Sequence, residues 1–306
     1  MNTSSIIQVE HITKNYGNFR AVDDVTIEVY QGEIFAMLGP NGSGKTTTIR
    51  MILDILRPDS GTIQVLGGPL NDDTKDRIGY LPEERGLYRN VPVLEVMTYL
   101  GRLKGMTGEA AKQRSLMLLE RLELADVARK KVSELSKGMQ QKVQFAVTIL
   151  HQPTLIIVDE PFSGLDPVNT LLIKDMLHDF RREGGTIIMS THQMYQVEEM
   201  ADRLLMLSKG QQKLYGAVEQ IRSQYAAHAI IVEGEGRWEA LPGVASVEVN
   251  GTGRTSARLN LTPEATADSV LAAIAASPDT QIRRFELAVP SLNDIFIHVA
   301  GGDRHD

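Results

Sequence analysis

The sequence predicts an α/β protein, in which a core built on a parallel sheet is followed by a small α+β domain. Two observations carry this prediction. The run TLIIVDEP, Thr154–Pro161, holds apolar residues without alternation, which is typical of a strand covered on both faces. Near residue 217 the pattern changes to short strand-like runs around an alanine-rich helix. We therefore expect a core domain at residues 1–220 and an accessory domain at residues 221–306.

Composition excludes several classes of protein. The chain has 306 residues, of which 42% are hydrophobic, and a formal net charge of −7, so no electrostatic footprint for nucleic acid is visible. The absence of cysteine excludes disulfides and thiolate metal sites. No apolar run approaches the ~20 residues of a membrane span, and the N-terminal residues lack the pattern of a signal peptide. We expect a cytoplasmic protein that reaches a membrane only through a partner.

Strand and helix patterns alternate along the core. Short strands are predicted at Ile6–Val9, Val25–Val29 and Ile34–Leu38, and a helix follows that ends before Pro58. More short strands lead to about Leu81. The later core elements are a helical region at about 86–150, the strand in TLIIVDEP, a helix at about 168–182, a strand at Thr186–Ser190 and a helix near 193–200.

The accessory domain shows a different order of elements. Strands are predicted at Ala229–Val232, Ser246–Val249, Ala257–Leu261 and Ile282–Leu287. Helices are predicted around 265–276 and from Ser291, where SLND resembles a capping box. We expect this domain to regulate the core or to support its dimerisation.

The run GPNGSGKT, Gly39–Thr46, matches the phosphate-binding pattern G-x-x-x-x-G-K-[ST]. Its position between an apolar strand and a helix disfavours a chance glycine-rich turn. Successive N–H groups and the N-terminus of the helix would bind phosphates, with Lys45 at the β- and γ-phosphates and the Thr46 hydroxyl on Mg²⁺. The predicted ATP-binding residues of this loop are Gly39, Pro40, Asn41, Gly42, Ser43, Gly44, Lys45, Thr46 and Thr47.

Polar residues at the ends of two later strands complete the predicted chemistry. Asp159 ends the strand in TLIIVDEP and would supply a second contact to Mg²⁺, while Glu160 would polarise an attacking water. His192 follows the strand Thr186–Ser190 and would face the γ-phosphate. The alternatives are a plain turn at the Asp–Glu pair and a structural histidine.

Four further motifs resemble those of one family. LSKGMQQ, Leu135–Gln141, is similar to the signature motif of ATP-binding-cassette (ABC) ATPases, usually written LSGGQ. SGLDP, Ser163–Pro167, resembles the D-loop of that family, His192 its switch histidine, and Tyr16 the aromatic residue that stacks on adenine. These elements occur in family order across roughly residues 5–217.

The resemblance implies a P-loop NTPase core with an antiparallel β subdomain and a helical subdomain, in which residues 1–220 form the ATP-binding domain. It also implies a head-to-tail dimer with a second copy or a homologous ATPase, driving an integral membrane permease. The signature residues Ser136, Lys137, Gly138 and Met139 would contact ATP bound by the other subunit. Lys137 and Met139 depart from the usual glycine and glutamine. Lys137 either adds a cation near the phosphate or points to solvent.

The stretch IGYLPEERGLY aligns with the loop in which this family carries a glutamine near Mg²⁺. Glu83 takes the place of that glutamine, and a carboxylate is a good ligand for a hard cation, so we expect Glu83 to face the metal. The alternative is an outward-facing Glu83. Apolar residues within 86–105, including Leu87, Tyr88 and Val91, would line a groove for a short helix of the permease, or else form subdomain core.

The stretch EERGLY, the signature motif and the SLNDIF ending together resemble the ATP-binding subunits of bacterial sodium-efflux and drug exporters. Such a subunit hydrolyses ATP with Mg²⁺ as cofactor on the inner face of the cell membrane. One alternative is a soluble ABC ATPase of an assembly system, such as iron–sulfur cluster assembly. Another is a small-molecule kinase, which LSKGMQQ and SGLDP disfavour.

Overall fold

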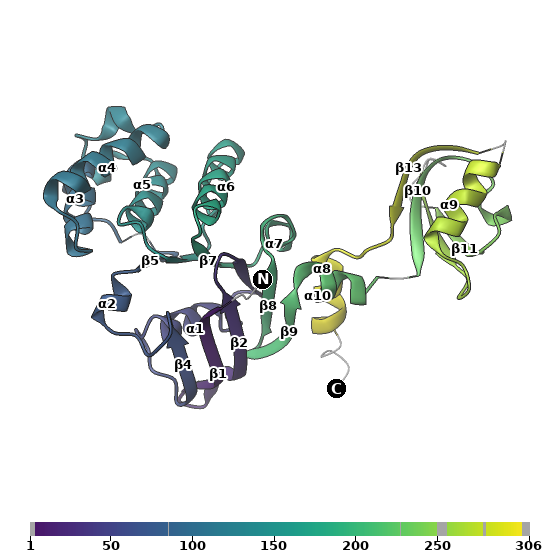
Figure 1. The fold of residues 1–306 in the computed structure, drawn as a ribbon, viewed down its shortest axis with the longest axis horizontal. Coiled ribbons are helices and arrows are strands. Elements are labelled where there is room, and N and C mark those ends of the chain that lie inside the picture. The colour runs from purple at the N-terminus through teal and green to yellow at the C-terminus, as the bar shows by residue number, and fades with distance from the viewer. Residues whose placement is uncertain (1–3, 85, 227, 250–255, 278–279, 302–306) are drawn as a thin grey trace. The chain divides into compact units, whose positions relative to one another are not determined.

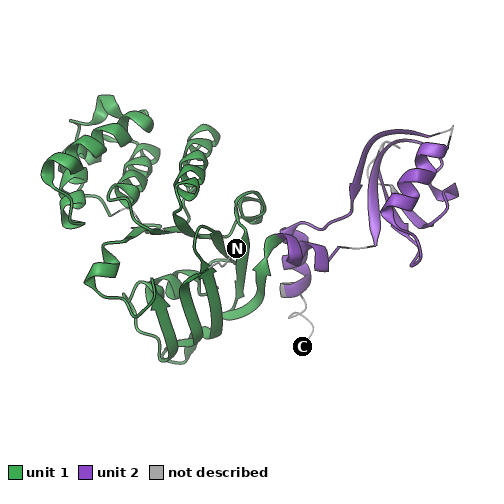
Figure 2. Ribbon diagram, viewed as in Figure 1, with its two compact units in different colours: residues 1–218 green, residues 219–306 purple. Residues whose placement is uncertain are grey.

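The computed structural model describes residues 4–84, 86–226, 228–249, 256–277 and 280–301. The chain forms two compact units, residues 1–218 and residues 219–306 (Figure 2). The first contains a mixed sheet with helices, and the second a small antiparallel sheet with helices. The predicted α/β core with an α+β C-terminal part is therefore confirmed.

The sheet of the first unit has nine strands in the order β4-β1-β2-β9-β8-β3-β7-β6-β5 (Figure 1). Strands β5, β6, β7, β3 and β8 run parallel, whereas β1 pairs antiparallel with both β2 and β4. The strands are β1 (Ser5–Tyr16), β2 (Phe19–Tyr30), β3 (Ile34–Leu38), β4 (Ser60–Val65), β5 (Ile78–Leu81), β6 (Leu155–Asp159), β7 (Thr186–Thr191), β8 (Arg203–Ser208) and β9 (Gln211–Ala217).

Three central strands determine where the residues of the predicted nucleotide site lie. Every residue of β3, β6 and β7 is buried, as the apolar runs predict. These strands are parallel neighbours, so their carboxyl ends lie at one edge of the sheet. Gly39 follows β3, Glu160 follows β6 and His192 follows β7, which brings the three predicted motifs to the same edge.

The helices of the first unit are α1 (Lys45–Ile52), α2 (Asp72–Lys75), α3 (Val93–Leu103), α4 (Gly108–Arg121), α5 (Lys137–Ile149), α6 (Pro167–Arg182) and α7 (Met194–Met200). Helices α3, α4 and α5 pack together as the helical subdomain. Side chains of Thr107, Ser136 and Asp166 cap the starts of α4, α5 and α6 by accepting backbone N–H bonds. No helix within the described parts of the chain is long and apolar enough to cross a membrane.

The second unit begins within α8 (Val218–Gln224), and its sheet has the strand order β11-β12-β10-β13. Its other elements are β10 (Ala229–Glu235), β11 (Val244–Val249), β12 (Ser256–Leu261), α9 (Ala267–Ala276), β13 (Gln281–Leu287) and α10 (Leu292–Gly301). Buried Val232, Leu259 and Val270 belong to one core cluster. At the start of α10 the Ser291 hydroxyl accepts from the Asp294 N–H, and the Asp294 carboxylate accepts from the Ser291 N–H, the reciprocal bonding of a capping box.

Two features of the first unit differ from the expectation. The β1–β2 hairpin is longer than the two predicted strands and closes at Tyr16 and Phe19. Strands β8 and β9, which pair antiparallel, were not predicted. The apolar, buried run of β8 did carry a strand signal that the sequence reading missed, whereas all of β9 is partly or fully exposed and carries no apolar alternation. Pairing with β8 rather than local propensity makes this strand.

Candidate nucleotide-binding site

The loop Gly39–Gly44 joins β3 to α1 and needs glycine at both of its ends. A Cβ atom on Gly39 would lie 2.3 Å from the Leu207 carbonyl oxygen. Gly44 has φ +108°, and a Cβ there would lie 2.6 Å from the Ala21 carbonyl oxygen. Only glycine therefore lets the loop fold this tightly against its neighbours.

A cavity of about 340 Å³ lies over this loop. It is lined by Tyr16, Phe19, Ala21, Asn41, Gly42, Ser43, Gly44, Lys45, Thr46, Thr47, Glu83, Asp159 and Glu160. Ser43 is 2% exposed, and within the described parts of the chain its Oγ has no hydrogen-bond partner. An unsatisfied buried hydroxyl costs about 1–3 kcal/mol. A phosphate oxygen in the cavity would remove that cost, so the loop fits a phosphate ligand.

Lys45 supplies a buried cation beside the cavity. Its side chain is 6% exposed, and its Nζ donates to the carbonyl oxygens of Gly39 at 2.7 Å and Pro40 at 3.2 Å. Burial lowers the pKa of Lys45, and the nearby carboxylates of Glu160, Asp159 and Glu83 oppose this effect. The three carboxylates favour the charged form of Lys45. A phosphate bound in the cavity would favour the same charged form.

Two hard oxygen groups from facing elements meet at the cavity. The Thr46 hydroxyl donates to Asp159 Oδ2 at 3.0 Å, and the Ser190 hydroxyl donates to the other oxygen of the same carboxylate. A hydroxyl and a carboxylate are ligands that Mg²⁺ accepts alongside water and phosphate oxygens. The residues present therefore fit a magnesium ion.

Glu160 and His192 contact each other directly. Glu160 Oε1 accepts from the backbone N–H of His192 at 3.0 Å and lies 2.7 Å from His192 Nδ1. Because a carboxylate only accepts, the hydrogen in this contact lies on Nδ1. Glu160 has φ +50°, a left-handed conformation that costs about 1 kcal/mol for a non-glycine residue. Its N–H donates to the Ser190 carbonyl at 3.0 Å, which helps hold this conformation.

The structure also brings Glu83 and Tyr16 to the cavity. Glu83 is exposed and close enough to Lys45 to oppose the lowering of its pKa. Tyr16 is 50% exposed at the turn of the β1–β2 hairpin. Its cross-strand partner Phe19 also lines the cavity, although sequence reasoning missed it. The sequence signal for Phe19 was an aromatic residue just beyond the Gly17–Asn18 turn.

The signature residues lie elsewhere. Ser136 is the N-cap of α5 and accepts from the Met139 N–H at 3.2 Å, while Ser136 and Lys137 are both exposed. None of Ser136, Lys137, Gly138 and Met139 lines the cavity over the loop. A single chain therefore does not join its signature motif to its own phosphate-binding loop.

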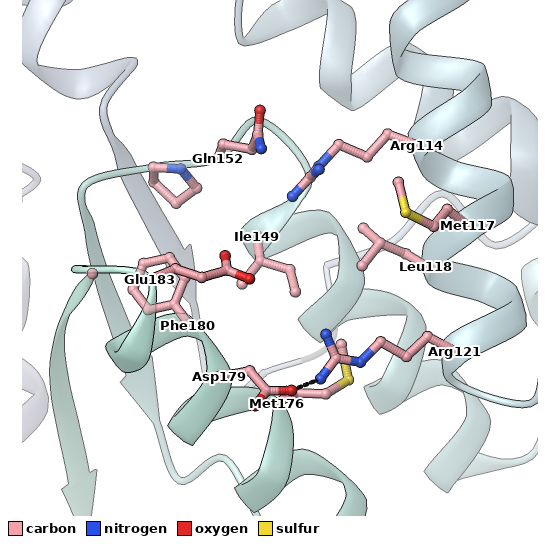
Figure 3. A pocket seen from close by; sticks show the side chains of 12 residues that line it. Arg114, Met117, Leu118, Arg121, Ile149, Gln152, Met176, Asp179, Phe180 and Glu183 are labelled. Carbon is pink, nitrogen blue, oxygen red and sulfur yellow. Dashed lines mark hydrogen bonds and ion pairs between the residues drawn. The ribbon is translucent and has the colours of Figure 1, made fainter.

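A second cavity, of about 360 Å³, is enclosed by α4, by α6 and by the chain that follows α5 (Figure 3). An ion pair between Arg121 and Asp179 crosses it, and Arg114 lies on the same side as Arg121. No residue predicted for nucleotide binding lines it. Size alone therefore does not identify the functional cavity of this protein.

An apolar groove of about 360 Å³ is lined by the chain that follows α1 and by residues of β5, α3 and α5. Its lining residues are Leu53, Ile55, Leu70, Lys75, Ile78, Gly79, Tyr80, Leu100, Leu103, Lys104, Val147, Thr148 and His151. Burial lowers the pKa of His151 to about 4, so this ring is neutral at pH 7. Leu100 and Leu103 fall within the range expected to line a groove, whereas Leu87, Tyr88 and Val91 do not line it.

The fold and the site define a class of protein first: a P-loop nucleotide-binding protein with a helical subdomain. Comparison with known proteins narrows the class. Residues 22–163 match the family model described as ABC transporter, and residues 216–300 match the ATP-binding protein DrrA1-3-like C-terminal domain. The chain is 38% identical to the ABC transporter ATP-binding protein YhaQ of Bacillus subtilis, over 97% of this chain and 99% of that protein.

Two further comparisons agree with the match to ABC transporter ATP-binding proteins. The daunorubicin resistance ATP-binding protein DrrA3 of Streptomyces coeruleorubidus is 29% identical over 97% of this chain and 96% of that protein. A solved structure described as the ATP binding subunit of an ABC transporter has a TM-score of 0.68 and 30% identity, covering 72% of this chain and 93% of that one. The chain belongs to the family of ABC transporter ATP-binding proteins, whose ATPase domain hydrolyses ATP. Subunits of this family dimerise and partner with membrane permeases.

Proposed function

We propose that this chain is the ATP-hydrolysing subunit of a bacterial ABC exporter on the inner face of the cell membrane. ATP would close a head-to-tail dimer, and closure would drive the permease. The observation that carries the proposal is the cavity that joins Lys45, the Thr46–Asp159 pair and Glu160, while the signature motif lies outside it. The similarity to a daunorubicin resistance protein supports export. Neither the family matches nor these relatives support an assembly-system ATPase.

Each residue at the cavity has a defined task in this proposal. The loop N–H groups and Lys45 bind the phosphates, and the exposed rings of Tyr16 and Phe19 offer a surface for adenine. Thr46 and Asp159 would hold Mg²⁺, which neutralises charge on the phosphate oxygens. Glu160 polarises the water that attacks the γ-phosphorus, ADP leaves, and the His192 hydrogen bond keeps the carboxylate aimed.

The signature motif completes the site of the other subunit. Ser136 to Met139 lie at the N-terminus of α5, where free N–H groups and the helix dipole favour a phosphate. Because these residues do not reach the loop of their own chain, two chains in head-to-tail arrangement would form two composite sites. The exposed Lys137 would then add a positive charge near the phosphate of the other subunit.

Complementation tests this arrangement. Lys45→Ala removes the ammonium group that binds the ATP phosphates. Ser136→Asp keeps a good N-cap but places a carboxylate against the phosphate of the other subunit's ATP. We expect each variant alone to be nearly inactive. A mixture should recover about a quarter of wild-type ATPase activity, because about half of its dimers are mixed and each mixed dimer has one intact site.

The activity is measured after the two inactive variants are mixed and equilibrated with Mg²⁺–ATP. Exchange of subunits is shown separately, by mixing two wild-type chains that carry different tags and recovering both through one tag. If the two variants together show no more activity than the sum of each alone, while exchange is demonstrated, the signature motif does not act on the ATP of the other subunit.

The apolar groove gives the proposed site for the permease. Ile55 is 62% exposed and Leu103 is 60% exposed, and both line the groove. An amphipathic helix of the membrane subunit would bury these side chains. The C-terminal unit, which matches the DrrA-like domain, would regulate the core or support the dimer.

We further propose that Glu83 faces the metal. Glu83→Gln restores the usual residue of the family and should keep ATPase activity. Glu83→Ala removes the oxygen ligand and should raise, severalfold, the Mg²⁺ concentration that gives half-maximal hydrolysis. A titration of hydrolysis against Mg²⁺ measures this. Identical Mg²⁺ curves for both variants and the wild type would mean that Glu83 points to solvent.

A further inference from the structure

The signature helix α5 carries a stripe of polar side chains turned toward the core. Gln141, Gln144 and Thr148 are spaced so that they share one face of the helix. Gln144 is 7% exposed and Gln141 is 9% exposed, so both amides are withdrawn from water. Buried amides need hydrogen-bond partners, and the partners of these two lie in the two loops that carry Glu83 and Glu160.

Gln144 holds the Glu83 loop from both sides. Its Nε2 donates to the carbonyl oxygen of Glu84 at 3.1 Å and to that of Pro82 at 3.4 Å. One turn further along α5, the hydroxyl of Thr148 lies 3.0 Å from the Gln144 carbonyl oxygen and 3.4 Å from the Tyr80 carbonyl oxygen, and its one hydrogen is shared between them. The amide of Gln144 thus binds the backbone on both sides of Glu83, the residue that we propose to face the metal.

Gln141 holds the other loop. Its Nε2 donates to the carbonyl oxygen of Pro161 at 2.8 Å, and Pro161 directly follows Glu160. Glu160 itself has a left-handed backbone, so its position depends on the contacts around it. The Gln141 hydrogen bond is one of those contacts.

The backbone of α5 lies directly against the strand that leads to Glu83. A Cβ atom on Gly79 in β5 would lie 2.2 Å from the Thr148 carbonyl oxygen. Such a close approach leaves no room for the helix to slide independently of the end of β5. A displacement of α5 is therefore passed to the loop beyond β5.

We propose that Gln144 and Gln141 are positioning residues, through which the signature helix fixes the Glu83 loop and the Glu160 loop of its own subunit. The inference rests on the proposed function. Because the N-terminus of α5 is the segment that would meet the second ATP, these two amides link the two composite sites. Gln144 acts on metal binding through Glu83, and Gln141 acts on water activation through Glu160.

Substitution by methionine separates these two roles. Methionine keeps the length of glutamine but donates no hydrogen bond, so packing is largely retained. We expect Gln144→Met to raise the Mg²⁺ concentration for half-maximal hydrolysis about fivefold, the factor that corresponds to one ordinary hydrogen bond. We expect Gln141→Met to lower kcat about fivefold, with KM for ATP and the Mg²⁺ requirement unchanged.

The two variants are matched controls for each other, since they make the same change on the same buried helix face. Gln113→Met, at an exposed position of α4, controls for methionine itself. If either variant fails to fold, Gln144→Asn or Gln141→Asn keeps the amide but shortens its reach, and the same shift is expected.

A purely structural role predicts that both variants lower thermal stability and the active fraction alike, with the same Mg²⁺ requirement and the same kcat per active site as the wild type. If that result is obtained while the wild type hydrolyses ATP and the Glu160→Gln variant does not, the positioning role of Gln144 and Gln141 is overturned. The proposed ATPase function then still stands. A wild-type chain that hydrolyses no ATP would overturn the proposed function itself, and the link with it.

Discussion

Glu160→Gln is expected to bind ATP with near wild-type affinity and to hydrolyse it about 10²–10⁴-fold more slowly, the range for loss of a general base. The amide keeps the shape of the carboxylate and still offers an oxygen to the His192 N–H groups. It does not accept the proton of the attacking water. ATP should therefore remain bound, and the variant should accumulate as an ATP-bound dimer.

Single-turnover hydrolysis and the mass of the complex in Mg²⁺–ATP measure the two effects. Glu120→Gln, at an exposed position of α4, is the control and should match the wild type. Turnover of Glu160→Gln close to that of the wild type would remove Glu160 from the role of base.

Leu103→Glu is expected to separate the chain from its membrane partner while ATP binding and basal hydrolysis persist. The substitution places a charge on the lining of the apolar groove, and burying an unpaired carboxylate under a partner helix is costly. The phosphate-binding cavity shares none of its lining residues with the groove. We expect recovery of the permease to fall at least about tenfold, which corresponds to 1.4 kcal/mol of binding free energy.

Leu116→Glu is the matched control, because Leu116 is 44% exposed on α4 and does not line the groove. The amount of membrane protein recovered with each variant from detergent-solubilised membranes is compared with the wild type. Equal recovery for Leu103→Glu and Leu116→Glu would place the docking surface outside the groove.

The elements predicted well are those with a strong local pattern. The apolar runs of β3, β6 and β7 are buried on both faces, and α6 begins at Pro167 behind the Asp166 cap. The hairpin strand β9 was missed because its residues are held by pairing with β8 rather than by burial. Such non-local pairing leaves little trace in the order of residues.

The candidate site shows the same division. Lys45, Asp159 and Glu160 stand in motifs whose chemistry can be argued residue by residue, and the structure brings them to one cavity. Phe19 and Gln144 carry no such motif. Phe19 reaches the cavity through the register of a hairpin, and Gln144 reaches the Glu83 loop through the packing of α5 against β5. Both placements depend on contacts between segments that are distant in sequence.

The central claim is that this ATPase works on a membrane permease. The most direct test is to recover the tagged chain from detergent-solubilised membranes of its own cells and to identify what accompanies it. We predict a membrane protein with several spanning helices, in an amount comparable to that of the chain. Recovery of only soluble partners, or of the chain alone, would contradict the exporter assignment and leave an ABC ATPase that acts on a soluble partner.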